Sequence, residues 1–297
     1  MDLRRFWNRA RLVQGFFGAG GRLRYASEVA SFVASSPVGA SRPLEVCVRS
    51  YRELRRLHEF GRNERPDSVW KWLNWISDCR MLYDIGASNG LEGLFALTKH
   101  GCSVTFVEPY TPSIESILKS VFVATRGGNV AGQVEIVHAG CGDTDGYARL
   151  LMHGAPIAGE NLNTFADPSA YLRVDGDDKR AKVAISQWVK GVTIDSLSTE
   201  HRLPAPSHVK IDVDGFEAKV ISGAASTLRA GTVESWAIET NGEANAAIVD
   251  AALRGAGYVE AERFVHYPGV VPATMDVIYV KPARLDDWRH FAAMPRT

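Results

Sequence analysis

Residues 81–101 constrain the fold more than any other part of the chain. They begin with the apolar run MLYDI, continue into the turn-prone loop GASNG, and end in an apolar–polar alternation typical of an amphipathic helix. A strand, a tight loop and a helix in this order form the start of a nucleotide-binding βαβ unit. Gly86 and Gly90 let the backbone approach a ligand where a β-carbon would clash. We therefore expect a ligand-binding loop at residues 84–90.

Strand patterns recur at regular intervals after residue 80. They fall at residues 80–86, 102–109, 133–140, 207–215, 233–240, 257–264 and 274–281, and helical patterns follow most of them. Strands that alternate with helices favour a parallel sheet covered on both faces. The last two strands are joined by too few residues for a crossover helix, so we expect them to form an antiparallel hairpin. The prediction is an α/β protein with a Rossmann-like, seven-stranded, mostly parallel sheet.

The chain before and after this sheet is expected to add smaller parts. Residues 1–79 read as a mainly helical extension, 80–283 as the α/β domain and 284–297 as a C-terminal tail. In the extension the patterns indicate helix through residue 35 with breaks at Gly18, Gly20 and Gly21, a linker at 35–43, a short strand at 44–49, and helices from Ser50 and Pro66. Ser50 and Glu53 have the spacing of a capping box. The tryptophans of the last helix, Trp70, Trp72 and Trp75, are typical of packing anchors.

Charge is unevenly distributed along the chain. Residues 1–65 carry 13 Arg and 6 acids, an excess of 13 − 6 = +7, although the formal net charge of the whole chain is zero. The zero net charge does not favour a nucleic-acid partner. The basic N-terminal segment is compatible with peripheral contact to an anionic membrane surface, but a solvated helical face is the commoner reading of such a charge pattern.

Compartment signals are few. The first residues mix charges and aromatics and lack the apolar region of a signal peptide, and no apolar run approaches the roughly 20 residues that span a bilayer. The four cysteines, Cys47, Cys79, Cys102 and Cys141, have no metal-site spacing. We interpret them as reduced thiols in or near the core, and expect a cytoplasmic protein.

Polar side chains follow four of the expected parallel strands. In open α/β sheets the ligand lies beyond the carboxyl ends of the strands, at the switch point. The candidate residues there are Asp84 with the loop Gly86, Ala87, Ser88, Asn89 and Gly90; Glu108 with Pro109; Asp212 with Asp214; and Glu239 with Asn241. Glu108 follows the first loop glycine by 108 − 86 = 22 residues, where an acid accepts the two hydroxyls of a ribose.

The loop composition separates two cofactor classes. A dinucleotide loop reads G-x-G-x-x-G, with its middle glycine making room for a pyrophosphate. Here Ser88 takes the middle position, and Asp84 disfavours a nearby phosphate. A ligand with a ribose, a cationic centre and no pyrophosphate fits better, and S-adenosylmethionine is such a ligand.

Three longer strings resemble a known family. The loop after Asp84, the VEP at 107–109, and VKIDVDGFEAKVISGA at 209–224 followed by AIET at 237–240 are similar to the FkbM family of S-adenosylmethionine-dependent methyltransferases. The resemblance covers about residues 80–281. It implies the class I methyltransferase fold, S-adenosylmethionine as cofactor, and a hydroxyl acceptor on a sugar, glycolipid, polysaccharide or polyketide-like product. Family members usually have Glu at position 214 and Asn at 276, where this chain has Asp214 and Asp276.

Catalytic and acceptor-binding candidates follow the fourth and fifth parallel strands. Asp212 is the leading candidate to accept the hydroxyl proton, with Glu239 as a second catalytic carboxylate. Asp214, Glu217 and Asn241 are candidates for substrate binding, and each of the three has an alternative role in capping or starting a helix. The acids and histidines form no compact metal motif, so no required metal is predicted. A divalent ion on Asp212 and Glu239 stays open as an alternative.

Two further segments complete the expected site. The loop of residues 139–143 should flank the adenine, which makes Cys141 and Asp143 cofactor-binding candidates, and His138 lies beside it or is packed. The long irregular segment 152–190 is expected to set acceptor specificity, with Asn161 as a sugar-binding candidate, or to be a solvent-facing hairpin. We also expect the strings ARLLMH and KVAISQW to pair as hairpin strands.

Two alternative functions stay open at this point. One is an NAD-dependent oxidoreductase, which the missing middle glycine and the closing hairpin disfavour. The other is a non-catalytic protein that binds a partner through its basic N-terminal part, which the presence of Asp84, Gly86, Gly90 and Glu108 disfavours. The acceptor molecule and the oligomeric state do not follow from the sequence.

Overall fold

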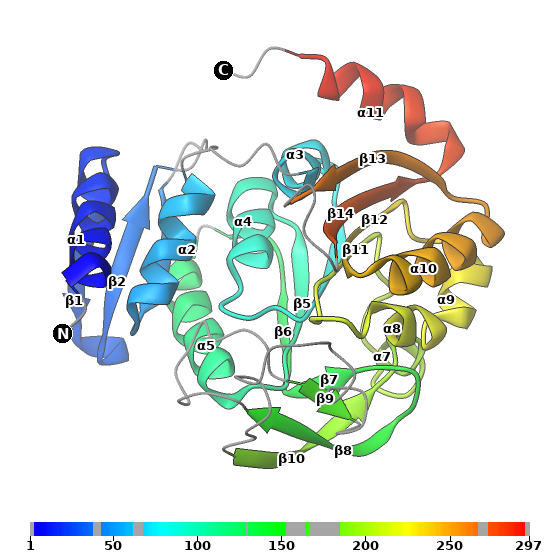
Figure 1. The fold of residues 1–297 in the computed structure, drawn as a ribbon, viewed down its shortest axis with the longest axis horizontal. Helices are drawn as coiled ribbons and strands as arrows, with labels where there is room; N and C mark the ends of the chain where they lie inside the picture. The colour runs from blue at the N-terminus through cyan, green and yellow to red at the C-terminus, as the bar shows by residue number, and fades with distance from the viewer. Residues whose placement is uncertain are drawn as a thin grey trace.

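A seven-stranded sheet forms the centre of the protein (Figure 1). The computed structural model describes residues 3–37, 43–61, 68–128, 130–152, 164–166, 185–266 and 273–294. Across the sheet lie β13 (Val259–Val265), β14 (Thr274–Val280), β12 (Ser235–Asn241), β11 (His208–Ile211), β4 (Met81–Ile85), β5 (Ser103–Val107) and β6 (Val134–Val137). Only β14 runs antiparallel to its neighbours β12 and β13, while the other pairs are parallel. The predicted α/β architecture with a closing antiparallel hairpin is confirmed.

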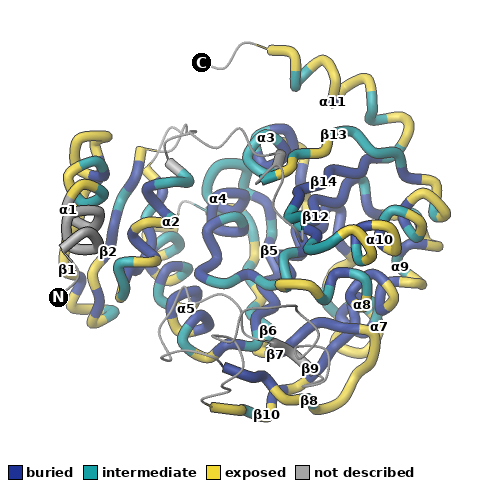
Figure 2. The backbone as a smooth tube through the Cα atoms, viewed as in Figure 1, coloured by how far each residue is buried: buried dark blue, intermediate teal, exposed yellow. Residues whose placement is uncertain are grey.

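Two hydrophobic cores lie on the two faces of this sheet. Successive strand residues point to opposite faces, so Leu82 belongs to one core and Tyr83 to the other. The helices of the α/β part are α4 (Leu91–His100), α5 (Thr111–Thr125), α7 (Ile194–Thr199), α8 (Glu217–Ser222), α9 (Ala225–Ala230), α10 (Glu243–Gly255) and α11 (Leu285–Ala292). Burial on both faces explains why β4 is buried along its whole length. In Figure 2 the part of the sheet around β12 and β14 is mostly dark blue, whereas α11 is mostly yellow.

The helical pattern that follows the strand expected at residues 207–215 forms two short helices. The structure ends α8 at Ser222 and begins α9 at Ala225. Gly223 lies between them, and a β-carbon there would come within 2.1 Å of the Gly142 carbonyl oxygen. The close approach of this neighbouring loop, which no local pattern reveals, interrupts the helix.

The N-terminal part contains a small sheet that the helical prediction missed. Helix α1 (Leu3–Gly18) is followed by β1 (Arg22–Ala26), the 3-10 turn η1 (Ser27–Val29), β2 (Ser31–Ser36) and β3 (Leu44–Val48), which form a three-stranded antiparallel sheet. The expectation of helix through residue 35 is therefore wrong. Gly20 has φ 81°, which turns the chain out of the helix, and β-branched and aromatic residues follow in the strands.

The strand and helices expected after residue 43 are present. Strand β3 packs beside α5, where the Cys47 amide donates to Ser120 Oγ at 2.9 Å. Helix α2 (Tyr51–Gly61) begins with the predicted capping box, because the Glu53 amide donates to Ser50 Oγ and the Ser50 amide donates to Glu53 Oε2.

Helix α3 (Ser68–Trp75) ties the N-terminal part to the sheet. Trp72 and Trp75 are buried in the same core as Leu82. The Trp72 indole donates to Ser235 Oγ on β12 at 2.7 Å, and the Trp75 ring packs edge-on against Trp288 of α11, with ring centroids 5.3 Å apart. These tryptophans act as packing anchors, as expected.

A second, four-stranded sheet lies beyond the carboxyl end of β6. Its order is β7 (Ala139–Cys141), β10 (Ile185–Val192), β8 (Gly146–Met152) and β9 (Thr164–Ala166). β8 and β10 pair antiparallel, which confirms the hairpin expected from ARLLMH and KVAISQW. Asn161 and most of residues 152–190 lie outside the described residues.

The cysteines differ from the expectation of four reduced thiols. Cys79 and Cys102 form a disulfide with their Cα atoms 5.3 Å apart, and Cys47 and Cys141 are free and buried. Cys79 and Cys102 come just before the neighbouring strands β4 and β5, whose residues Met81 and Ser103 are paired. The pairing of these strands, and no feature of the local sequence, brings the two sulfurs together.

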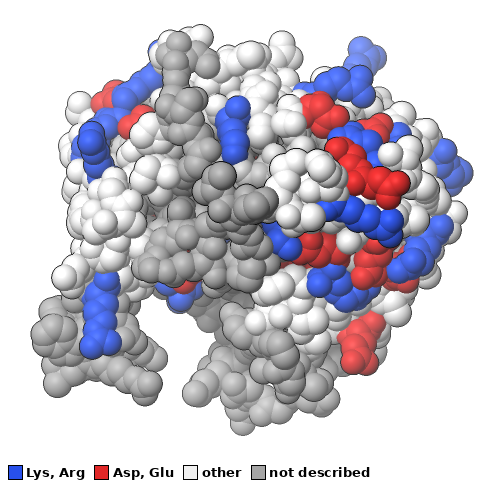
Figure 3. Space-filling model, turned by 90° about the horizontal axis from the view of Figure 1, so that it is seen from above, with Lys and Arg blue, Asp and Glu red and all other residues white. Residues whose placement is uncertain are grey.

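In Figure 3 the described basic and acidic side chains are mixed on the right-hand side of the view. In the N-terminal part, Arg24 pairs with Glu45 at 3.4 Å and Arg49 pairs with Glu115. Part of the positive charge is therefore balanced locally. Among the described residues, no helix has the length and apolar character needed to cross a bilayer.

Candidate functional site

A cavity of about 400 Å³ opens at the carboxyl ends of β4, β5, β11 and β12. Its size is that of a small-molecule site, roughly 300–1,000 Å³. Of the residues singled out from the sequence it is lined by Gly86, Ser88, Asn89, Glu108, Pro109, Asp212, Asp214 and Glu239. The structure thus gathers residues from four separate strand ends around one space, as expected for the switch point of an open α/β sheet.

The loop after β4 is held by contacts with the protein itself. Gly86 and Gly90 have φ of 71° and 77°. A β-carbon on Gly86 would come within 1.9 Å of the Asp212 carbonyl oxygen, and one on Gly90 would come within 3.1 Å of Ile117. These glycines make room for the neighbouring strand end and helix, and their expected role in the approach of a ligand stays a prediction.

Asp84 lies beneath the loop and does not line the cavity. Its side chain is fully buried, with Oδ2 accepting from the Gly93 amide at 3.1 Å and Oδ1 lying 3.3 Å from Lys210 Nζ. Burial raises the pKa of Asp84 to about 6, while the Lys210 ammonium favours the ionised form. In this geometry Asp84 orders the start of α4 and binds a lysine.

Lys210 is a central residue that the sequence reading did not assign. Its ammonium donates to the Gly86 carbonyl at 3.2 Å and lies 3.6 Å from Asp212 Oδ2. Burial opposes its charge, but Asp84 and Asp212 outweigh burial and raise the pKa of Lys210 above its usual value. The available signal was a lysine between the two β-branched residues of the strand HVKI.

Glu108 lies at the cavity wall beside the loop. Oε2 accepts from the Ser88 amide at 2.7 Å and Oε1 accepts from the Tyr110 amide at 2.9 Å. Burial is the largest influence and raises the pKa of Glu108 to about 7. Each oxygen keeps a second lone pair, so the carboxylate can accept two further hydrogen bonds from neighbouring hydroxyls. Pro109 follows, and its carbonyl lies 3.0 Å from His138 Nε2.

Helices α2 and α3 close one side of the cavity. Arg56 of α2 donates to Ser88 Oγ at 2.7 Å. Phe60 and Trp70 also line the space, with ring centroids 4.8 Å apart in an edge-to-face arrangement. Arg56 and Phe60 were not predicted at the site, and Trp70 was expected only as a packing anchor, because no motif links these helices to the loop that starts at Gly86.

Three carboxylates approach one another at the ends of β11 and β12. Asp212 is 37% exposed at its side chain, and Asp214 has φ 53° in the turn that follows. The pKa of Glu239 is raised well above its usual range, first by the Asp212 carboxylate and then by burial and by Asp276. The raised pKa of Glu239 reflects several acidic groups that lie close together in a partly buried place.

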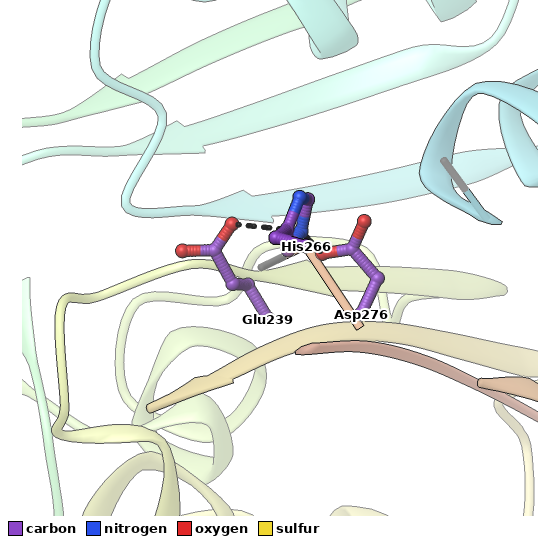
Figure 4. Close-up of side chains that lie close together, drawn as sticks. All are labelled: Glu239, His266 and Asp276. Atoms are coloured by element: carbon purple, nitrogen blue, oxygen red, sulfur yellow. Dashed lines mark ion pairs between the residues drawn. The ribbon is translucent and has the colours of Figure 1, made fainter. Parts of the chain in front are cut away.

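A second group of residues meets Glu239 from the closing hairpin (Figure 4). His266 follows β13, and its Nε2 atom lies 3.0 Å from Asp276 Oδ1 and 3.6 Å from Glu239 Oε2. The pKa of Asp276 is raised by burial, with His266 opposing the shift. His266 was not among the sequence candidates, and Asp276 was noted only as a difference from the family pattern.

The remaining candidates lie outside the cavity lining. Glu217 is buried and accepts from the Gly215 amide at 2.9 Å, as a cap of its own turn, and burial raises its pKa to about 7. Asn241 Oδ1 accepts from Thr274 Oγ1 at 2.9 Å.

Three cofactor-binding candidates also lie outside the lining of this cavity. Ala87 is buried, and burial raises the pKa of the buried Cys141 thiol to about 12. Asp143 lines a separate small cavity beside Lys219.

A family model and several solved structures are similar to this chain. A model of the methyltransferase FkbM domain matches residues 84–260. A methyltransferase FkbM from Methylobacillus flagellatus is 17% identical, with a TM-score of 0.44 over 77% of this chain and 56% of its own. A SAM-dependent methyltransferase from Agrobacterium tumefaciens is 11% identical, with a TM-score of 0.42 over 81% and 67%. The chain thus spans little more than half of the first of these structures, and no curated protein sequence matches it.

Proposed function

This chain belongs to the FkbM methyltransferase family, and we propose that it methylates a hydroxyl oxygen with S-adenosylmethionine as the methyl donor. The acceptor class we propose is a sugar, a glycolipid or polysaccharide, or a related natural product. The observation that carries the proposal is the position of Glu108. Backbone amides hold its two carboxylate oxygens at the wall of a cavity that several other acidic residues also line.

The residues present fit this cofactor. Glu108 can accept both ribose hydroxyls, and Ser88 with Asn89 places polar groups beside it. Asp212, Asp214 and Glu239 make the adjoining wall acidic, which favours a sulfonium and an ammonium over a pyrophosphate. When bound, S-adenosylmethionine supplies an electrophilic methyl group on sulfur, which leaves as a neutral thioether.

Asp212 is the proposed acceptor of the hydroxyl proton. Its carboxylate is accessible from the cavity, and Lys210 offers a compensating positive charge at 3.6 Å. As the hydroxyl oxygen bonds to the methyl carbon, the carbon–sulfur bond breaks and the proton passes to Asp212. Glu239, the second carboxylate we propose for catalysis, adjoins Asp212 at the same wall of the cavity. Much of the remaining effect is positioning of the two reactants.

The lining on the α2 and α3 side supports a carbohydrate-like acceptor. Phe60 and Trp70 present apolar rings, and Arg55 and Glu59 add polar groups at the same opening. Sugars expose apolar faces together with hydroxyls, so aromatic surfaces with a few charged groups suit them.

Calorimetry tests the cofactor part of the proposal. The purified chain should bind S-adenosylmethionine and S-adenosylhomocysteine, and should not bind NAD. Binding of NAD alone would favour the oxidoreductase alternative, and binding of none of the three would favour the non-catalytic alternative.

Isotope transfer tests the acceptor part. With methyl-labelled S-adenosylmethionine and a panel of glycans and glycolipids, the label should enter a product and should resist mild alkali, as an ether does. Label that alkali releases as methanol would indicate a carboxyl ester and would contradict hydroxyl methylation.

A further inference from the structure

Two carboxylates face each other on neighbouring strands of the sheet. Glu239 of β12 and Asp276 of β14 are direct partners in the antiparallel register, so their side chains point to the same face. Asp276 is 2% exposed, and the Glu239 side chain is 27% exposed. Like charges at directly opposite positions destabilise a sheet, and the more so when buried. A cationic partner between them would remove this cost.

His266 brings a third ligand atom to the same point. Its imidazole lies between the two carboxylates in Figure 4. One atom from each of the three side chains can be chosen so that all lie within 4.8 Å of one another. Nε2 is 3.0 Å from Asp276 and 3.6 Å from Glu239. Two ligands about 2.1 Å from one ion, at tetrahedral or octahedral angles, would be roughly 3.0–3.4 Å apart.

Lys210 lies near these carboxylates but makes its contacts with other groups. Its ammonium contacts Asp84, Asp212 and the Gly86 carbonyl. His266 carries at most one positive charge, against the two carboxylates of Glu239 and Asp276 and the adjacent Asp212. The described side chains around this point therefore leave an excess of negative charge.

We propose that Glu239, His266 and Asp276 bind a divalent first-row transition-metal cation, such as Mn²⁺ or Zn²⁺. One imidazole nitrogen with two carboxylate oxygens is a ligand set for such ions, whereas Ca²⁺ and Mg²⁺ favour oxygen ligands alone. The ligands come from two strands and the first residue after a third, so the sheet fixes their spacing. All three line the same cavity as Glu108 and Asp212, which leaves the open coordination positions facing that space.

The role of the cation rests on the proposed function, although the site itself rests on geometry. A cation at this point can bind the acceptor hydroxyl, lower its pKa and direct the oxygen toward the methyl group. The proton still passes to a carboxylate such as Asp212. This role gives a function to Glu239 and Asp276, whose carboxylates form no ion pair with Lys210.

Mn²⁺ binding to the full chain tests the site directly. After treatment with a chelator and its removal, titration with Mn²⁺ followed by electron paramagnetic resonance should show one bound ion per chain. Zn²⁺ should displace it. Asp276→Asn keeps the shape of a buried ligand and should weaken Mn²⁺ binding at least 10- to 100-fold, as loss of even an outer-shell partner does. Absence of saturable binding up to about 1 mM would overturn the proposal.

A second variant and a control protect the test against misfolding. His266→Gln changes a ligand at a strand end and should both weaken binding and remove the nitrogen coupling seen by pulsed resonance. Asp286→Asn makes the same charge change at a surface position that is 94% exposed, and should bind as the unaltered chain does. Circular dichroism verifies the fold of each variant. Equal affinity in all three variants would place the ion elsewhere and would refute the site.

The outcomes separate this site from the proposed function. Calorimetric binding of S-adenosylhomocysteine by the chelator-treated chain, without any Mn²⁺ binding, would reject the cation site and leave the methyltransferase proposal standing. Mn²⁺ binding without binding of the sulfur ligand would do the reverse.

Discussion

Lys210 and Asp84 form a buried ion pair beneath the loop, with Lys210 Nζ 3.3 Å from Asp84 Oδ1. The two residues face each other across the parallel strands β11 and β4, where they are direct register partners. The lysine also holds the Gly86 carbonyl, so the pair connects the sheet to the loop. The two contacts hold the start of the loop against the ends of the strands, at the wall of the cavity.

Replacing the lysine should therefore be costly. Lys210→Met leaves Asp84 buried without its cation, and we expect a loss of about 3–5 kcal/mol in the free energy of unfolding. Urea denaturation measures it. The double variant Asp84→Asn with Lys210→Met should lose less than Lys210→Met alone, because no buried charge remains unpaired beneath the loop and only the partly exposed Asp212 loses its cation. Equal losses in the single and double variants would contradict the ion-pair interpretation.

Gly86 should tolerate no side chain. Gly86→Ala combines a left-handed φ of 71° with a β-carbon 1.9 Å from the Asp212 carbonyl oxygen. Gly231→Ala is the matched control, since its φ is 59° and nothing lies within 4 Å of the added carbon. Thermal unfolding should show a loss of about 1–2 kcal/mol for the control, from backbone strain alone. Gly86→Ala should lose clearly more free energy of unfolding than the control. An equal loss in the two variants would show that the backbone at Asp212 moves to make room for the added carbon.

Glu108 should determine cofactor affinity. Glu108→Ala removes hydrogen bonds from a charged acceptor, each worth about 1.5–3 kcal/mol, so binding of S-adenosylhomocysteine should weaken about 10- to 100-fold. Calorimetry measures it, with Glu200→Ala on the exposed end of α7 as the control. Unchanged affinity in Glu108→Ala would remove Glu108 from the site.

His208 should make stability fall in mild acid. Burial lowers the pKa of His208 from 6.5 to about 4, so the folded state binds fewer protons than the unfolded state between these values. The stabilising contribution is complete above pH 6.5 and is lost as the pH falls through 4. Between pH 7 and pH 5 the loss should be about 2 kcal/mol. Urea denaturation at pH 7 and at pH 5 measures the free energy of unfolding at each pH. The difference between the two should be smaller in His208→Gln than in the unaltered chain. An equal difference would show that other groups cause the loss.

Periodicity and loop chemistry were enough to predict the sheet. Residues 81–101 and the later strand patterns specify a parallel α/β sheet, and the short connection before β14 specifies its antiparallel end. The same reasoning placed Glu108, Asp212 and Glu239 at one edge, because the carboxyl ends of parallel strands meet there. These inferences succeed because each depends on local pattern and on a rule of topology.

Long-range contacts were beyond such reasoning. The β1–β2 hairpin was predicted as helix, and the Cys79–Cys102 bond was not expected, because both depend on which segments lie side by side. The approach of Arg56 to Ser88 likewise joins segments with no shared motif.

The sequence by itself determined which segments form strands and which residues stand at the strand ends. Only the tertiary structure decided what those residues contact. It placed Asp84 under the loop with Lys210, out of the cavity, and brought His266 between Glu239 and Asp276. The physical reason is that strand ends follow from period and connection length, whereas side-chain partners follow from how separate strands and helices pack in space.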